Sequence, residues 1–166
     1  SVDLTVLLDE IHGFNCPVPV SFQFKGPNDL IFEAVELVTF PAGEGPTSPP
    51  RIIGVREGIS RTEIFTSNGS KNQIFRLNPG ENRFVADGTV EVRVAGVPWT
   101  LAELITFDQT DQVEIDFNSQ PTTVRFGDGV AGNVPPSGAE VKVTYVATSG
   151  KSGLVLADTI TDVVAP

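Results

Sequence analysis

Asp128 stands between two glycines in the segment FGDGVAG, residues 126–132, where its carboxylate could serve catalysis or metal binding. A calcium-binding EF-hand loop needs further carboxylates before its glycine and a glutamate six residues after it. Only one acid is present here, and Val130 and Ala131 follow the second glycine. Glycines permit positive φ angles, and an aspartate can accept hydrogen bonds from the backbone N–H groups of its own turn. We therefore expect Asp128 to shape a turn between two strands.

A second group of acids lies in the segment FDQTDQVEIDF and comprises Asp108, Asp111, Glu114 and Asp116. Glu114 and Asp116 alternate with apolar residues, so we expect both on the solvent face of a strand. Asp108 and Asp111 bracket a turn. Glycoside hydrolysis would need one carboxyl in an apolar pocket that raises its pKa, and no local pattern indicates such a pocket. A structural role is favoured over a metal site or a catalytic pair.

His12 and Cys16 are four residues apart, a spacing that would place both on one face of a helix. Gly13 and Pro17 weaken any helix there, and two ligands are too few for structural zinc. A Cys–His nucleophile pair also needs a third, orienting group. The only histidine has no G-x-S-x-G segment to accompany it in a serine triad. Since Cys16 is the only cysteine, the chain forms no internal disulfide, and we expect a small buried apolar side chain.

The remaining motifs also favour a protein without catalytic, cofactor-binding or metal-binding residues. No G-x-x-x-x-G-K-[ST] or G-x-G-x-x-G segment occurs, and the glycines of residues 126–132 precede no helix that would hold a phosphate. Trp99, Tyr145 and the phenylalanines could stack on a sugar, but aromatic residues at alternating strand positions are more often part of a core.

The elements that carry these residues are predicted to be short strands, because apolar residues recur at every second position. The clearest alternations join Val90, Val92 and Val94, then Val113, Ile115 and Phe117, then Val141, Val143 and Tyr145, with Phe22 and Phe24 forming a shorter one. This spacing predicts a mainly β fold, an antiparallel β-sandwich or barrel-like modules with long Gly- and Pro-containing loops and little helix. The segments WTLAELI and RTEIF are each compatible with one helical turn, and WTLAELI equally with a short strand.

The 166 residues suit one domain or two small ones. The loop PAGEGPTSPP, residues 41–50, contains four prolines and two glycines and is expected to be exposed and partly extended. We predict an N-terminal β lobe over residues 1–65 and a second β lobe over residues 66–150. Residues 151–166 would form a C-terminal strand or a connecting segment.

The net charge of −10 and the pI of about 4.4 repel phosphate backbones and anionic membranes. No apolar run approaches the roughly 18 residues of a membrane-spanning helix. We therefore expect neither nucleic acid nor a membrane as partner, whereas a basic protein surface would be attracted. The chain contains no methionine, which favours a fragment or a processed chain.

Three motifs follow one another in an order that resembles the baseplate J-like family, the wedge proteins of contractile phage tails and related injection machines. They are SNGSKNQIFRL, then VPWT, then TVRFGDGVAGNVPPSGAEVKVTYVATSGKSG. The matching residues are Ser67, Gly69, Asn72, Gln73, Phe75, Leu77, Trp99, Phe126 to Gly129, Gly132, Pro135, Pro136, Gly138, Thr144 and Tyr145. Residues 32–44 resemble the family's segment just upstream, less specifically. The resemblance covers about residues 30–155. The family's preceding region and its following N-P and G-G turns are missing, which suggests the middle of a longer wedge protein or a reduced member.

The resemblance implies a structural role in a ring around the tail tube, in the baseplate of the virion, after assembly in the host cytoplasm. No catalytic residues come with the family. The expected partners are other baseplate or tail subunits, in homo- and hetero-oligomers, contacted through loops such as 41–50 and 127–138. One alternative is a carbohydrate- or receptor-binding β-sandwich of a tail adhesin, with Trp99, Tyr145 or a phenylalanine exposed beside acids. Another is a hydrolase that uses a pair of carboxylates.

Overall fold

The structure, a computed structural model, describes residues 2–8, 10–26, 29–108, 110–150 and 162–163. Over these ranges it is mainly β and contains no helix, which confirms the predicted fold class. The chain divides into two compact units. Unit 1 comprises Ser1–Ile59 and Ser149–Pro166, and unit 2 comprises Ser60–Thr148. The predicted boundary after residue 65 lies inside a strand, six residues beyond this division.

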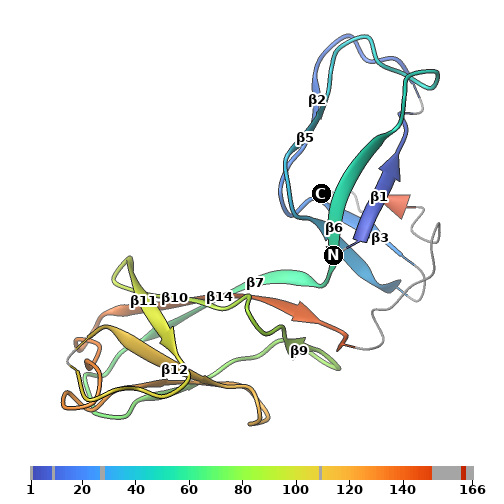
Figure 1. Cartoon of the computed structure of the whole chain (residues 1–166). Coiled ribbons are helices and arrows are strands. Elements are labelled where there is room, and N and C mark those ends of the chain that lie inside the picture. Colours follow the sequence, from blue (N-terminus) through green and yellow to red (C-terminus); the bar gives the residue numbers. More distant parts are fainter. Residues whose placement is uncertain (1, 9, 27–28, 109, 151–161, 164–166) are drawn as a thin grey trace. The chain divides into compact units, whose positions relative to one another are not determined.

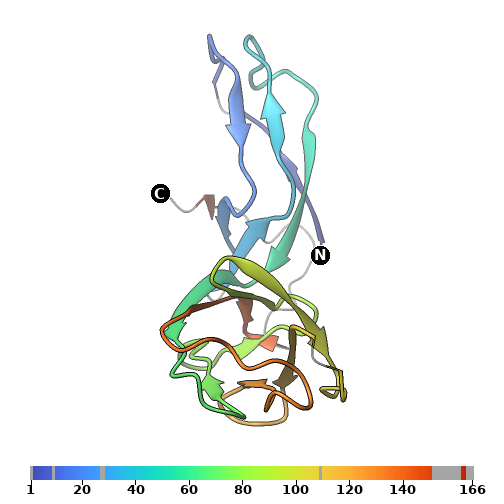
Figure 2. The ribbon, with the colours of Figure 1, turned by 90° about the vertical axis from the view of Figure 1, so that its left-hand side faces the viewer.

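Unit 1 contains a five-stranded antiparallel sheet that curves into a half-barrel (Figure 1). Its strands, in spatial order, are β1 (Val2–Val6), β6 (Arg51–Glu57), β4 (Ile31–Ala34), β3 (Gln23–Lys25) and β15 (Asp162–Val163). A separate two-stranded ribbon pairs β2 (Cys16–Val18) with β5 (Val38–Phe40), and both views show these strands side by side (Figures 1 and 2). The core of unit 1 includes Phe24, Phe32, Phe40, Ile53 and Val55.

Unit 2 is an eight-stranded sheet that closes almost completely into a barrel. In spatial order its strands are β7 (Ile59–Thr66), β14 (Glu140–Thr148), β10 (Glu91–Val94), β11 (Val97–Ala102), β12 (Gln112–Asp116), β13 (Thr123–Phe126) and β8 (Ile74–Arg76). The short β9 (Phe84–Val85) pairs with the end of β14. Phe65 of β7 and Phe75 of β8 stack with ring centroids 4.8 Å apart, so side chains bridge the two edge strands.

The alternation in the sequence decides which residues enter the barrel core. Val90, Val92, Val94, Val113, Val141, Val143 and Tyr145 are all buried there, as their period of two predicts. Phe117 differs, with 38% of its surface exposed. The strand ends at Asp116, whose carboxylate accepts hydrogen bonds from the N–H groups of Asn118 (2.9 Å) and Ser119 (3.2 Å). This turn releases Phe117 from the predicted face.

One strand pair departs from the antiparallel pattern, because β11 and β12 run parallel. Residues 103–111 bring the chain back, and the Thr100 N–H donates to the Asp111 carbonyl at 2.8 Å where the pair begins. The first four residues of WTLAELI, 99–102, form the end of β11, where Trp99 pairs with β10 and residues 100–102 pair with β12. The segment RTEIF lies within β7. Pairing on both edges of WTLAELI outweighs its weak local preference for a helical turn. Of residues 151–166, predicted to form a C-terminal strand or a connecting segment, only residues 162–163 lie within the described ranges, in β15.

Candidate functional site

Residues of the SNGSKNQIFRL motif form a buried polar junction in unit 2. The Ser67 hydroxyl donates a hydrogen bond to the carbonyl of Pro135 and accepts one from Gln73 Nε2, each at 2.9 Å. Gln73 Oε1 in turn accepts the N–H of Asn68 at 3.0 Å. Since Ser67 and Gln73 are both buried, these bonds satisfy polar groups that would otherwise destabilise the barrel. The junction ties residues 67–73 to the loop after β13.

Backbone contacts extend this junction along the loop of residues 127–138. The Gly138 N–H donates to the Ser67 carbonyl at 2.7 Å, and the Asn72 N–H donates to the Gly127 carbonyl at 3.0 Å. A Cβ atom on Gly69 would lie 2.9 Å from Cβ of Ser137, so only glycine permits this approach. The motif that suggested the family thus has a direct structural use, which is to hold the loop of residues 127–138 against residues 67–72.

The FGDG segment is a tight turn closed by its own aspartate. Asp128 Oδ1 accepts the N–H groups of Val130 and Ala131, both at 2.8 Å. These two bonds lower the pKa of Asp128, and the positive charge of Lys71 lowers it further. A Cβ atom on Gly127 would lie 2.2 Å from the Ala131 carbonyl oxygen, which explains the glycine. Asp128 therefore stabilises a turn between two strands, as expected from the sequence.

A second loop, between β11 and β12, is hydrogen-bonded to the turn. The Gly132 N–H donates to the carbonyls of both Thr106 and Asp108 at 3.1 Å. The Asn133 N–H donates to the Thr110 carbonyl at 2.9 Å, and its side-chain amide donates to Asp111 Oδ1 at 2.9 Å. Hydrogen bonds therefore join the two loops, residues 103–111 and 127–138. The end of unit 2 that these loops form is here called the tip.

The acids considered for a metal site or a catalytic pair are engaged separately. Asp108 accepts hydrogen bonds from the Thr106 hydroxyl, which lowers its pKa most, and from the Gln112 amide at 3.1 Å. Glu114 pairs with Arg125 of the neighbouring strand. Within the described part of the chain, no group of three or more His, Cys, Asp or Glu side chains is placed to hold a metal ion.

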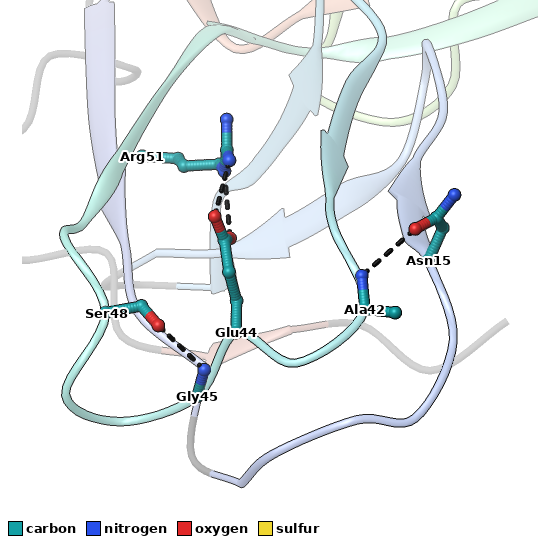
Figure 3. Close-up of polar contacts among 6 residues, drawn as sticks. All are labelled: Asn15, Ala42, Glu44, Gly45, Ser48 and Arg51. Atoms are coloured by element: carbon teal, nitrogen blue, oxygen red, sulfur yellow. Dashed lines mark hydrogen bonds and ion pairs between the residues drawn. The ribbon is translucent and has the colours of Figure 1, made fainter.

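The loop of residues 41–50 in unit 1 is held by polar contacts on both sides, as Figure 3 shows. Glu44 forms a forked ion pair with Arg51, with N–O distances of 2.7 and 3.2 Å, and this contact lowers the pKa of Glu44. The Ser48 hydroxyl accepts the Gly45 N–H at 3.0 Å, and Asn15 Oδ1 accepts the Ala42 N–H at 3.0 Å. Despite its four prolines, this loop has a defined shape in unit 1.

His12 and Cys16 lie near this loop but not on a helix. Cys16 belongs to β2, pairs with Phe40 of β5 and packs against the unit 1 core, but it is only half-buried and thus less buried than expected. The ring of His12 lies 5.6 Å from the ring of Phe14, and its carbonyl accepts the Gly43 N–H at 2.8 Å. His12 therefore contributes to the packing of the loop.

Of the aromatic residues considered for sugar stacking, Trp99 and Tyr145 are buried, at 8% and 1% exposure. Trp99 packs edge-to-face on Phe126, with centroids 5.1 Å apart. The exposed aromatics are instead phenylalanines in loops or at strand ends, among them Phe14, Phe84 and Phe107. Their exposure could not be predicted individually from the sequence, because a phenylalanine in a loop carries no periodic signal.

One surface pocket in unit 2, of about 240 Å³, is lined by residues 77–80, 83–85, 117 and 119–122. Its lining includes Arg83, Phe84 and Phe117 but no aspartate, glutamate, histidine or cysteine. It therefore lacks the carboxylate pair that glycoside hydrolysis requires.

The described residues include no helix that could span a membrane. No family model, curated protein or solved structure matches the chain. The resemblance to baseplate wedge proteins accordingly stays a prediction that depends on the motif residues, whose contacts are given above.

Proposed function

We propose that the chain is a structural module of the baseplate of a phage tail or a related contractile injection machine. In this role it contacts neighbouring baseplate or tail subunits in homo- and hetero-oligomers and carries out no catalysis. The observation that carries the proposal is the buried junction of Ser67 and Gln73 with Pro135. Three of the residues that resemble the family, Ser67, Gly69 and Asn72, contact the loop of residues 127–138 and help to fix it.

The surface of both units supports a role in assembly. Large apolar side chains are exposed in loops, at Ile11 and Phe14 in unit 1 and at Leu104, Phe107 and Val130 in unit 2. Apolar side chains exposed to water are available for burial against a partner, which is favourable. The hydrogen bonds that hold these loops reduce the entropy lost when a partner binds them.

The acids support the same role, because the contacts described above already use Asp128, Asp108 and Glu114 in turns and in a strand pair. The net charge of −10 favours basic protein partners and disfavours nucleic acids and membrane surfaces. Complementary charge at such an interface would fix the register between subunits more than it would add affinity. The proposed location is the tail baseplate of the virion, assembled in the host cytoplasm.

The adhesin alternative would now depend on exposed phenylalanines, since Trp99 and Tyr145 are buried. Electron cryomicroscopy of intact particles that carry the complete gene product with an internal tag separates the two functions. Density in a ring around the tail tube supports the baseplate module. Density restricted to the host-facing tip, or tail particles that assemble normally without the protein and fail only to adsorb, would contradict it and favour the adhesin.

A further inference from the structure

The tip of unit 2 presents three large apolar side chains to solvent. Phe107 is 89% exposed, Leu104 is 68% exposed and Val130 is 58% exposed. They come from the two loops that Gly132 joins through its N–H bonds to the carbonyls of Thr106 and Asp108. The three residues, here called the tip patch, therefore belong to one hydrogen-bonded end of the barrel.

The backbone on both sides of Phe107 is fixed. Besides the bonds to Gly132, the Thr106 N–H donates to Gln112 Oε1 at 3.0 Å. Ile105 occupies the space above Gly132, where a Cβ atom would lie 2.5 Å from its Cγ2. These hydrogen bonds thus hold the backbone next to Phe107, whereas Phe107 itself is almost fully exposed. An aromatic ring held this way loses little entropy on burial in a partner, a property of binding hot spots.

The two loops that carry the tip patch contain acidic but no basic residues. Residues 103–111 contain Glu103, Asp108 and Asp111, and residues 127–138 contain Asp128, with no lysine or arginine in either range. The net charge of the two segments is therefore −4, from three acids plus one. The positive charge of Lys71 reaches Asp128 from the neighbouring loop. Such a rim repels anionic lipids and a second tip of the same kind, and attracts a basic surface.

We propose that the tip patch docks into an apolar pocket, bordered by lysine or arginine side chains, on a neighbouring protein subunit. Phe107 is the central anchor, Leu104 and Val130 flank it, and the acids fix orientation at the rim. The identity of that subunit as a baseplate component rests on the proposed function, whereas the chemistry of the pocket rests on the tip alone.

Site-specific photo-crosslinking in the cells that naturally make the complete protein tests this. Photoreactive benzoylphenylalanine replaces Phe107 in one variant and Phe84, an exposed phenylalanine of unit 2 away from the tip, in the control. Mass spectrometry then identifies the crosslinked peptides. We expect position 107 to crosslink to one peptide whose apolar residues lie beside lysine or arginine. Adding Glu103→Lys should lower that yield about tenfold, because it reverses a rim charge.

The outcomes separate the two proposals. A basic, apolar target in a protein that is no tail component supports the docking surface and contradicts the baseplate role. Crosslinking at position 107 no stronger than at position 84, or to acidic segments or lipid, overturns the docking surface even if the protein lies in the baseplate. The fluorescence of Trp99, which is buried in unit 2, shows that each variant is folded.

Discussion

The phenolic hydroxyl of Tyr145 in β14 donates a hydrogen bond to the Glu63 carboxylate in β7. Glu63 Oε1 also accepts the N–H of Asn78 at 2.7 Å, so this carboxylate links β14 to the segment that follows β8. Burial of Tyr145, followed by its hydrogen bond to Glu63, raises the pKa of the phenol above its ordinary value. The pair therefore helps to close the barrel at its two edge strands, but only while the phenol keeps its proton.

We predict that unit 2 loses stability in alkali through Tyr145. Its raised pKa means that the native state holds a proton that the unfolded state releases above about pH 10, so the stabilisation is complete below that pH and falls as the pH rises. The slope approaches about 1.4 kcal/mol per pH unit for one proton. Denaturant unfolding followed by Trp99 fluorescence, from about pH 8 to about pH 11, measures it.

The matched variant is Tyr145→Phe, which keeps the ring and removes the hydroxyl. It should lower the free energy of unfolding by about 1–2 kcal/mol at neutral pH and flatten the alkaline slope. An unchanged slope in this variant would assign the alkaline transition to other groups.

We predict that Gly127→Ala destabilises unit 2 by about 3 kcal/mol, because the new Cβ meets backbone atoms that cannot move aside. The Ala131 and Gly132 carbonyl oxygens lie 2.2 and 2.4 Å from its position. Gly138→Ala is the control: its φ of 80° is unfavourable for alanine, but no heavy atom lies within 4 Å. It should cost only about 1 kcal/mol. Equal losses in the two variants, measured by denaturant unfolding, would show that the loop rearranges around the methyl group.

Asp128 should stabilise the turn as a hydrogen-bond acceptor and not as a metal ligand. Its lowered pKa means that this stabilisation is present above the ordinary aspartate pKa and is lost as the pH falls through the lowered value. Asp128→Asn, which keeps an acceptor oxygen, should be less destabilising than Asp128→Ala. Millimolar Ca²⁺, Mg²⁺ or Zn²⁺ should leave the melting temperature of the wild type unchanged. A rise in the wild type that Asp128→Asn abolishes would instead establish a metal site.

The forked ion pair of Glu44 and Arg51 should hold the loop of residues 41–50 closed. We predict that Arg51→Lys, which keeps the charge but not the fork, accelerates amide hydrogen exchange at Gly43 and Gly45. The same amides should exchange faster in wild type as acid protonates Glu44, after correction for intrinsic rates. Ser67, buried in unit 2, provides the internal control. Unchanged exchange in Arg51→Lys would show that the backbone bonds suffice to hold the loop.

The strands were predictable because burial imposes a period of two, and Val92, Val113 and Val143 follow it. Their faces are fixed by local alternation alone, whatever the order of strands in the sheet. The parallel pairing of β11 with β12 was not predictable in this way. It depends on how residues 103–111 turn back, and their sequence is compatible with several loop shapes.

In the candidate site, too, the local features could be predicted from the sequence and the long-range contacts could not. The turn formed by Asp128 follows from neighbouring residues, since flanking glycines and an acceptor side chain specify it locally. The contact of Ser67 with Pro135 joins residues 68 positions apart, and the exposure of Phe107 depends on bonds from Gly132. Neither leaves a periodic trace in the sequence, so only the folded chain reveals the junction and the tip patch.

The placement of β7 beside β14 has a mechanical consequence. Contacts of Thr62 with Thr144 and of Ser67 with Ala139 show that the two strands run in opposite directions. The chain therefore enters unit 2 at Ser60 and leaves it at Thr148 at the same end of this strand pair. Tension that separates those two connections acts on the ladder one rung at a time, beginning at that end, instead of shearing all rungs together. Under load, the barrel would therefore open first between β7 and β14, beginning with the hydrogen bonds next to Ser60 and Thr148.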